Sequence, residues 1–367
     1  MSILSLANPY VCELVAYRPG KPIEETAREI GMKPADIVKL ASNENSLGAS
    51  PRAVRAMQEA ASGVHIYPDG ASYALRCKLA ETFGLDVAQT AVGNGSSELI
   101  ELMAHIFVRP GIETIAADYS FTLYAIVTRL LNGTYKSVPN KADWSHDLQG
   151  MLAAITPQTR LVFITNPTNP VGTMVGQAEI DAYMAAVPEH VITVFDEAYI
   201  DFAEEQPDTL RYVREGRPVV VLRTFSKAYG LAGARVGAAL TTPEIAELLH
   251  KARSPFNVNL LGQAAALAAL DDPEHVARSV AMVNAGRRQY EQAFRAWGIP
   301  YIPSQTNFIL VQVGQGKAVF DACLRRGVIL RPMDAYGLPE YIRITIGTET
   351  ENKRCLAVLA EVLGKQK

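Results

Sequence analysis

The sequence lacks the features that mark membrane proteins, secreted disulfide-rich proteins and zinc proteins. None of its apolar runs approaches the roughly 20 residues that span a bilayer. Residues 1–9 do not join a basic stretch to a long apolar run, so we expect no secretory signal. The four cysteines (Cys12, Cys77, Cys323 and Cys355) are widely separated, and the six histidines are dispersed. These spacings predict reduced thiols, no metal site and a cytoplasmic protein.

An excess of charge of either sign is also missing. The 367 residues include 35 Lys and Arg against 38 Asp and Glu, which gives a formal net charge of −3. A surface that binds nucleic acid or an anionic membrane normally needs an excess of basic residues, so we expect neither partner. With 49% hydrophobic and 20% charged residues, the composition is that of a globular protein. The length favours one large domain and one smaller domain.

From about residue 90 to 255, short apolar segments alternate with helical patterns. This alternation predicts an α/β fold, with a mainly parallel sheet flanked by helices on both faces. The expected strands are 90–93, 114–117, 161–165, 191–195, 219–222 and 236–240, and the expected helices begin near Ser97, Phe121, His146, Gln177 and Ala246.

The pattern changes after residue 257. Residues 258–297 are largely helical with an interruption at 271–273, and an α+β pattern follows. The expected strands there are 307–313, 328–330 and 341–346, with helices at 317–326 and 349–363. We therefore predict an arm at 1–40 that packs on the smaller unit, a large domain at 41–255 and a small C-terminal domain at 256–367.

Lys227 follows the apolar segment 218–222, which predicts a buried parallel strand. Ligands of open α/β sheets bind at the carboxyl ends of such strands. Apolar surroundings disfavour the charged form of a lysine and expose a nucleophilic amine, as Schiff-base chemistry with a carbonyl cofactor requires. A surface lysine at a strand end is the ordinary alternative.

Two further strands are expected to deliver polar side chains to the same edge of the sheet. The strand at 161–165 runs into Asn166-Pro-Thr-Asn169-Pro, a rigid turn that presents two asparagines. The strand at 191–195 delivers Asp196, and a buried carboxylate is costly without a cationic or strongly donating partner. A protonated pyridine nitrogen is one such partner. An ordinary Asn-Pro turn and a helix N-cap are the alternatives.

An anion site is indicated beside Lys227. Thr224, Ser226 and Arg235 flank the lysine, and hydroxyls with a guanidinium group suit a phosphate monoester. The segment 93–97 joins a strand to a helix through small residues, where free N–H groups and the helix dipole favour an anion. The four strand-end motifs together supply an amine, an acid, an asparagine and a phosphate cup. These are the requirements of pyridoxal 5′-phosphate.

At this point the sequence resembles the fold-type I, aspartate-aminotransferase-like pyridoxal-phosphate enzymes, and within them the histidinol-phosphate aminotransferases. The likeness runs from residue 39 to residue 347, and the run 226–237 around Lys227 is its most specific part. It implies a large domain with a mainly parallel seven-stranded sheet and a smaller α+β C-terminal domain.

The resemblance also implies roles for the cofactor-binding residues. Lys227 would form the Schiff base and then shuttle a proton, and Asp196 would pair with the ring nitrogen. Tyr199 and Asn169 would hydrogen-bond the phenolic oxygen, and Phe121 would stack on the ring. The phosphate group would be held by Gly95, Ser96, Ser97, Thr224, Ser226 and Arg235. Asp118-Tyr119 departs from the family pattern, which leaves Tyr119 as an alternative stacking ring.

For the substrates, the resemblance implies transfer of an amino group between L-histidinol phosphate and 2-oxoglutarate, in histidine biosynthesis. Arg331 and Arg343 would bind the phosphate of one substrate and the carboxylates of the other, with Tyr17 and Asn43 also at the substrate. Tyr67 would reach the cofactor phosphate of a neighbouring subunit, so the resemblance implies a homodimer with shared sites and an arm that also contacts the partner.

Three other functions remain open at the level of sequence. An aromatic-amino-acid aminotransferase would use Arg343 for the amino-acid carboxylate and take a phenyl ring in the pocket. A phosphothreonine decarboxylase has a similar pattern, because no motif reports which bond stands perpendicular to the cofactor ring. A non-catalytic binding protein of the same fold would not need Lys227.

Overall fold

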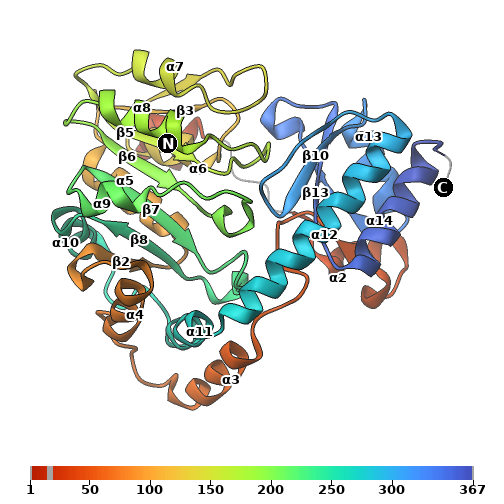
Figure 1. The fold of residues 1–367 in the computed structure, drawn as a ribbon, viewed down its shortest axis with the longest axis horizontal. Helices are drawn as coiled ribbons and strands as arrows, with labels where there is room; N and C mark the ends of the chain where they lie inside the picture. The colour runs from red at the N-terminus through yellow and green to blue at the C-terminus, as the bar shows by residue number, and fades with distance from the viewer. Residues whose placement is uncertain (1, 15–19, 366–367) are drawn as a thin grey trace.

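The computed structural model describes residues 2–14 and 20–365. Figure 1 shows a larger part built around a central sheet and a smaller part at the C-terminal end, with the long helix α12 (Pro273–Trp297) lying along the smaller part. The interruption predicted at 271–273 separates α12 from α11 (Leu260–Leu270).

The central sheet has seven strands in the order β2-β8-β7-β6-β5-β3-β4, and the predicted α/β class is confirmed. All neighbouring strands pair in parallel except β8, which is antiparallel to both β2 and β7. The strands are β2 (Thr90–Gly93), β3 (Glu113–Ala117), β4 (Thr134–Val138), β5 (Thr159–Thr165), β6 (Ile192–Asp196), β7 (Val219–Thr224) and β8 (Gly237–Thr241).

Strand β4 was not expected from the sequence. It lies at the edge of the sheet and pairs only with β3 among the described residues. Its residues are Thr-Tyr-Lys-Ser-Val, and all but the last are exposed or half-buried. An edge strand that packs on one side carries fewer apolar residues than a central strand, and a hydrophobic run therefore does not reveal it.

Two helical layers cover the central sheet, and alternation along the strands decides which residues meet each layer. In β5, Leu161 and Phe163 pack toward α5 (Ser96–Phe107) and α6 (Leu123–Leu130). Val162 and Ile164 pack on the opposite face, which three other helices cover. These are α7 (Leu148–Ala153), α8 (Gln177–Ala186) and α9 (Leu210–Arg214). This part also contains α1 (Pro9–Cys12), α3 (Pro51–Ala60), α4 (Tyr73–Phe83), α10 (Pro243–Ala252) and α11.

The smaller part has a four-stranded sheet with the order β12-β13-β10-β9. Its strands are β9 (Tyr301–Ile302), β10 (Phe308–Gln312), β12 (Arg331–Pro332) and β13 (Tyr341–Thr345), and its helices besides α12 are α13 (Gly316–Leu324) and α14 (Glu349–Val362). The apolar faces of these elements meet in one buried cluster.

The predicted strand 328–330 is shorter and does not join that sheet. It forms β11 (Val328–Ile329), which pairs in parallel with β1 (Val38–Lys39) from the N-terminal segment. Helix α2 (Ile23–Ile30) packs beside this pair, where Ala27 contacts the cluster that contains Ile329. Figure 1 shows α2 next to the smaller part.

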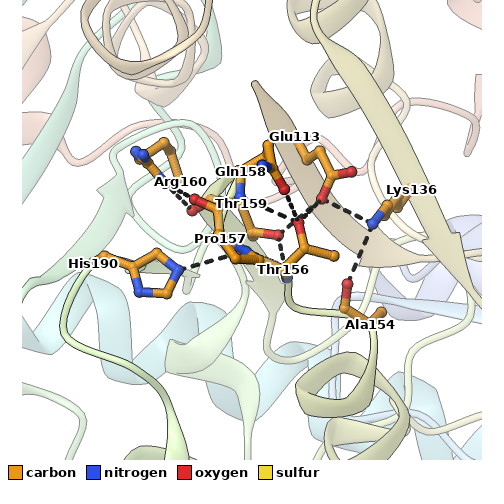
Figure 2. A network of polar contacts seen from close by, with 9 residues as sticks. All are labelled: Glu113, Lys136, Ala154, Thr156, Pro157, Gln158, Thr159, Arg160 and His190. Carbon is orange, nitrogen blue, oxygen red and sulfur yellow. Dashed lines mark hydrogen bonds and ion pairs between the residues drawn. The ribbon is translucent and has the colours of Figure 1, made fainter. Parts of the chain in front are cut away.

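A polar network ties the amino-terminal ends of β3 and β5 together (Figure 2). The carboxylate of Glu113 lies 2.8 Å from the Lys136 ammonium group and accepts hydrogen bonds from the hydroxyls of Thr156 and Thr159. Burial raises the pKa of Glu113, but the ion pair with Lys136 and the hydrogen bonds from Thr156 and Thr159 together lower it below its usual value. The network therefore fixes the pairing of three strands at the end of the sheet opposite to their carboxyl ends.

In the described part of the chain, no helix is both long enough and apolar enough to cross a membrane.

Candidate active site

A cavity of about 550 Å³ lies at the carboxyl ends of β5, β6 and β7, between the larger and smaller parts. Thirteen of the residues expected at the site line it: Asn43, Ser96, Ser97, Phe121, Asn169, Asp196, Tyr199, Thr224, Ser226, Lys227, Arg235, Arg331 and Arg343. Asn43 and Arg343, which are 300 positions apart in the sequence, therefore line the same cavity. The described residues contain no cluster of His, Cys, Asp and Glu that could hold a metal ion.

Lys227 reaches the cavity from the turn that follows β7. Its Nζ donates hydrogen bonds to the carbonyl oxygens of Ser42 and Asn43, over 3.3 and 3.2 Å. It also lies 5.5 Å from the centre of the Tyr199 ring. Two backbone carbonyl groups and an aromatic ring therefore surround the amine, and its charge acts on the carboxylate of Asp196.

Asp196 ends β6 on the cavity wall and is 3% exposed. Its Oδ2 accepts a hydrogen bond of 2.6 Å from the hydroxyl of Tyr124, whereas its buried Oδ1 has no hydrogen-bond partner among the described residues. Burial raises the pKa of Asp196, and the hydrogen bond from Tyr124, the backbone N–H of Ala198 and the charge of Lys227 oppose that rise. A buried acceptor without a donor is costly, so this oxygen fits a ligand N–H such as a pyridinium group.

Asn169 and Tyr199 have hydrogen-bonding groups left for a ligand. The Oδ1 atom of Asn169 accepts from Nη1 of Arg343 at 2.5 Å, so its amide NH₂ remains as a donor. The Tyr199 hydroxyl oxygen accepts from Nδ2 of Asn43 at 3.0 Å. Burial raises the pKa of Tyr199, so its hydroxyl keeps its proton and can donate it. The bond between Asn169 and Pro170 is cis, as is the bond between Asn166 and Pro167.

The amino-terminal end of α5 and Arg235 form an anion-binding corner. Gly95 precedes the helix with a φ of +78°, and a Cβ atom there would lie 2.4 Å from Nη2 of Arg235. Glycine is therefore required for the guanidinium group to approach this closely. Gly95 does not line the cavity itself but packs against Arg235. Helix N–H groups, a guanidinium group and the hydroxyls of Thr224 and Ser226 together fit a phosphate group.

Arg331 and Arg343 are register partners on the neighbouring antiparallel strands β12 and β13. Directly opposed residues of such a pair project from the same face of the sheet, and both side chains line the cavity. Arg343 is 7% exposed and its guanidinium carbon lies 4.9 Å from the centre of the Phe308 ring. The two positive charges fit anionic groups on a substrate.

Of the two candidate stacking rings, Phe121 lines the cavity. Tyr119 instead packs against Trp144, 5.2 Å between ring centres, in a cluster with residues of the smaller part. Tyr67 is not on the cavity wall of its own chain. It is 77% exposed and stacks on Phe256 with 4.5 Å between ring centres. Tyr17 lies outside the described residues.

Sequence reasoning missed three residues of the site. Tyr124 holds the Asp196 carboxylate from outside the cavity wall and contacts the hydroxyl of Thr165, which lines the cavity. Tyr336 lines the wall from a short turn at Asp334–Tyr336. Tyr124 and Thr165 are 41 positions apart, and only the packing of α6 on β5 brings them together. No spacing in the sequence signals this contact.

A strand-end amine and a buried acid on one cavity wall, with an anion-binding corner beside them, are the arrangement of enzymes that use pyridoxal 5′-phosphate. Residues 35–359 match the family described as aminotransferase class I and II. The protein belongs to this family of pyridoxal-phosphate-dependent transaminases.

Two relatives that are similar to this protein along nearly its whole length are both described as histidinol-phosphate aminotransferases. A histidinol-phosphate aminotransferase of Akkermansia muciniphila is 62% identical over 363 residues, which cover 99% of this chain and 100% of that protein. Histidinol-phosphate aminotransferase 2 of Pseudomonas fluorescens is 48% identical over 367 residues and 99% of each chain.

Solved structures agree with the fold. The histidinol-phosphate aminotransferase of Sinorhizobium meliloti, in complex with pyridoxal 5′-phosphate, superposes with a TM-score of 0.88 at 29% identity over 98% of both chains. An aspartate aminotransferase of Thermus thermophilus has a TM-score of 0.84 at 21% identity, over 97% of this chain and 99% of that one, and supports the fold alone.

Proposed function

We propose that this protein is a histidinol-phosphate aminotransferase. It would convert L-histidinol phosphate and 2-oxoglutarate to imidazole-acetol phosphate and L-glutamate, by a ping-pong mechanism in histidine biosynthesis. The observation that carries the proposal is the pair Arg331 and Arg343, opposed on one cavity wall of a transaminase. The names of the relatives at 62% and 48% identity support the same substrate.

Pyridoxal 5′-phosphate fits the residues present. Asp196 would hold the ring nitrogen with the Oδ1 atom that has no donor among the described residues, and Asn169 and Tyr199 would donate to the phenolic oxygen. Phe121 would stack on the ring, and Gly95, Ser96, Ser97, Thr224, Ser226 and Arg235 would surround the phosphate group. When bound, the cofactor supplies an electron-withdrawing ring that stabilises negative charge on the substrate carbon.

Lys227 would perform the proton transfer. Its Nζ donates hydrogen bonds to the carbonyl oxygens of Ser42 and Asn43, which would orient the amine in the cavity. A lysine held in this way can take a proton from the substrate carbon and return it at a neighbouring position. An ionised Asp196 would keep the ring nitrogen protonated while this occurs.

The arginine pair would serve both halves of the reaction. L-histidinol phosphate carries a phosphate group and no carboxylate, whereas 2-oxoglutarate carries two carboxylates. Guanidinium groups bind both kinds of anion with paired hydrogen bonds. Because both substrates place an anion at the same wall, one pocket can accept each in turn. Asn43, and Tyr17 outside the described residues, complete the proposed substrate site.

A homodimer with shared sites is part of the proposal. Tyr67 is 77% exposed and away from the cavity of its own chain, which supports a role at the cofactor phosphate of a second subunit. We also propose a division into an arm (1–40), a large domain (41–255) and a small domain (256–367), and a cytoplasmic location.

The test compares kcat/KM for histidinol phosphate, phenylalanine and tyrosine, each with 2-oxoglutarate as amino acceptor. We expect histidinol phosphate to be preferred by a large factor. A preference for phenylalanine or tyrosine would instead identify an aromatic-amino-acid aminotransferase. Release of carbon dioxide from phosphothreonine, without amino transfer, would identify a decarboxylase.

A further inference from the structure

Tyr124, which no sequence motif singled out, contacts Asp196 without lining the cavity itself. It projects from α6 into the core between this helix and the sheet, and is fully buried. Its hydroxyl donates to Oδ2 of Asp196 at 2.6 Å and lies 2.8 Å from Oγ1 of Thr165. It does not line the cavity, whereas Asp196 and Thr165 do.

The direction of these hydrogen bonds follows from proton counting. An ionised carboxylate only accepts, so the single proton of the Tyr124 hydroxyl goes to Asp196. The Thr165 hydroxyl must then donate to the oxygen of Tyr124. The three groups form a one-way chain from Thr165 through Tyr124 to Asp196, in which each hydrogen bond strengthens the next.

Strand β5 holds Tyr124 in place at both ends of its side chain. Phe163 stacks under the Tyr124 ring, with 4.5 Å between ring centres and 5° between planes. Thr165, two residues later on the same face of the strand, meets the hydroxyl. Phe121, on the cavity wall, contacts the ring edge-on at 5.8 Å. A ring fixed by three neighbours cannot swing away from the carboxylate.

The chain of hydrogen bonds decides which oxygen of Asp196 is left for a ligand. Oδ2 is occupied by Tyr124, and Oδ1 is buried without a partner among the described residues. Register pairing also sets Thr165 beside Asp196 on the adjacent strands β5 and β6. The carboxylate therefore has one defined orientation before any ligand arrives.

The protonation states agree with this arrangement. Burial and the neighbouring carboxylate raise the pKa of Tyr124 well above its usual value, so the hydroxyl remains a donor across the working range of pH. Burial also raises the pKa of Asp196, and the hydrogen bond from Tyr124 is the first influence that opposes it. Removing the Tyr124 hydroxyl would therefore raise the pKa of Asp196 further.

We propose that Tyr124 is a positioning residue for the cofactor: supported by Thr165, it orients Asp196 with Oδ1 available to the ring nitrogen and favours the ionised carboxylate. This inference rests on the proposed use of pyridoxal 5′-phosphate. Tyr124 acts through Asp196 and contacts neither substrate nor cofactor itself.

The test measures binding of pyridoxamine 5′-phosphate to the cofactor-free protein, because this form makes no covalent bond to Lys227 and depends on the contacts of the ring and phosphate. Tyr124→Phe removes one oxygen atom and keeps the ring. We expect a dissociation constant about tenfold higher than in the wild type, as for loss of a hydrogen bond to a charged group.

Tyr183→Phe is the matched control. Tyr183 is also fully buried, and its hydroxyl also meets a strand threonine, Thr193, at 3.2 Å, but it packs on the opposite face of the sheet. Tyr183→Phe should leave the dissociation constant unchanged. Equal weakening by the two substitutions would overturn the proposal, because loss of any buried hydroxyl would then explain the effect. Thermal unfolding of both variants shows whether they are folded.

The pH dependence separates positioning from packing. Asp196 lacking its donor should take up a proton at a higher pH than in the wild type, so the affinity deficit of Tyr124→Phe should widen as the pH is lowered from about 8 to about 6. The groups facing Asp196 that also enter this balance are Lys227, Tyr199 and Glu197. A deficit that stays constant with pH would contradict the electrostatic part of the proposal.

A double-mutant cycle tests the direction of the chain. Thr165→Val should weaken binding when Tyr124 is present. It should add no further loss in the Tyr124→Phe background, because the Thr165 hydroxyl then has no tyrosine oxygen to which it can donate. Additive losses would refute the chain of hydrogen bonds from Thr165 through Tyr124 to Asp196. Failure of the wild type to bind pyridoxamine 5′-phosphate would instead refute the proposed cofactor. Wild-type binding that Tyr124→Phe does not weaken would refute only the role of Tyr124.

Discussion

Removal of the Arg331 guanidinium group is the sharpest test of how this cavity selects its substrate. Arg343 is a poorer choice for this purpose, because its side chain also holds Asn169 and lies over the Phe308 ring. Its loss would disturb the cofactor site together with the substrate site. Arg331 lies opposite Arg343 in the strand pairing and lines the same wall.

The expected size of the effect follows from the hydrogen bonds that a guanidinium group makes to a phosphate. Hydrogen bonds to charged groups contribute about 1.5–3 kcal/mol. Loss of this contribution in the transition state lowers kcat/KM roughly 10- to 100-fold. The loss should apply to histidinol phosphate and not to histidinol, which lacks the phosphate group, and only weakly to phenylalanine.

The assay is the steady-state kinetics of Arg331→Ala with histidinol phosphate, histidinol and phenylalanine. Arg331→Lys keeps the charge without the planar fork and should give an intermediate result. Arg325→Ala, on the exposed surface of the smaller part, is the control for removal of any arginine. Equal losses for all three amino donors would refute a phosphate-binding role for Arg331.

Four further predictions follow from the geometry of the site and the core. Lys227→Ala should lose the visible absorption band of the lysine-bound cofactor, and an unchanged band would exclude this lysine. Mixing subunits that carry Tyr67→Phe with subunits that carry Lys227→Ala should restore part of the activity, since one hybrid site would be intact; no recovery would argue against shared sites. Gly95→Ala should weaken cofactor binding by displacing the Arg235 guanidinium group, because the new Cβ would lie 2.4 Å from its Nη2; equilibrium dialysis with pyridoxamine 5′-phosphate measures this, and wild-type affinity would contradict it. Burial lowers the pKa of His146 from 6.5 to about 4, so between these values the unfolded chain binds the proton more readily, and the free energy of unfolding falls as the pH drops from 6.5 to about 4. In urea unfolding, this fall should be smaller by about 3 kcal/mol in His146→Gln. An equal fall in both proteins would refute the prediction.

Much of the large part of the fold could be predicted from the sequence because its central strands are buried on both faces. Val219 to Leu222 form a continuous apolar run, and the residues that follow such runs meet at one edge of the sheet. The polar edge strand β4 was missed for the converse reason, since it has no such run.

Contacts that depend on packing between distant elements were not predictable. The bond from Tyr124 to Asp196 requires α6 to lie on β5 and β6 at one register, and nothing local to either residue fixes this. The exposed position of Tyr67 could likewise not be derived from its neighbours in the sequence. Tyr336 reaches the cavity through a short turn that has no periodic pattern.

Asn43 has a consequence that extends beyond its own place on the cavity wall. Its carbonyl oxygen accepts from Lys227, its side-chain amide donates to Tyr199, and its N–H donates to the hydroxyl of Thr345 at the end of β13. β13 also carries Arg343. Asn43 therefore connects the strand that carries Arg343 to the Lys227 amine within a single residue, so a displacement of β13 would also displace the amine. Under the proposed roles of Arg343 and Lys227, the fit of the substrate anion and the alignment of the amine are coupled through Asn43.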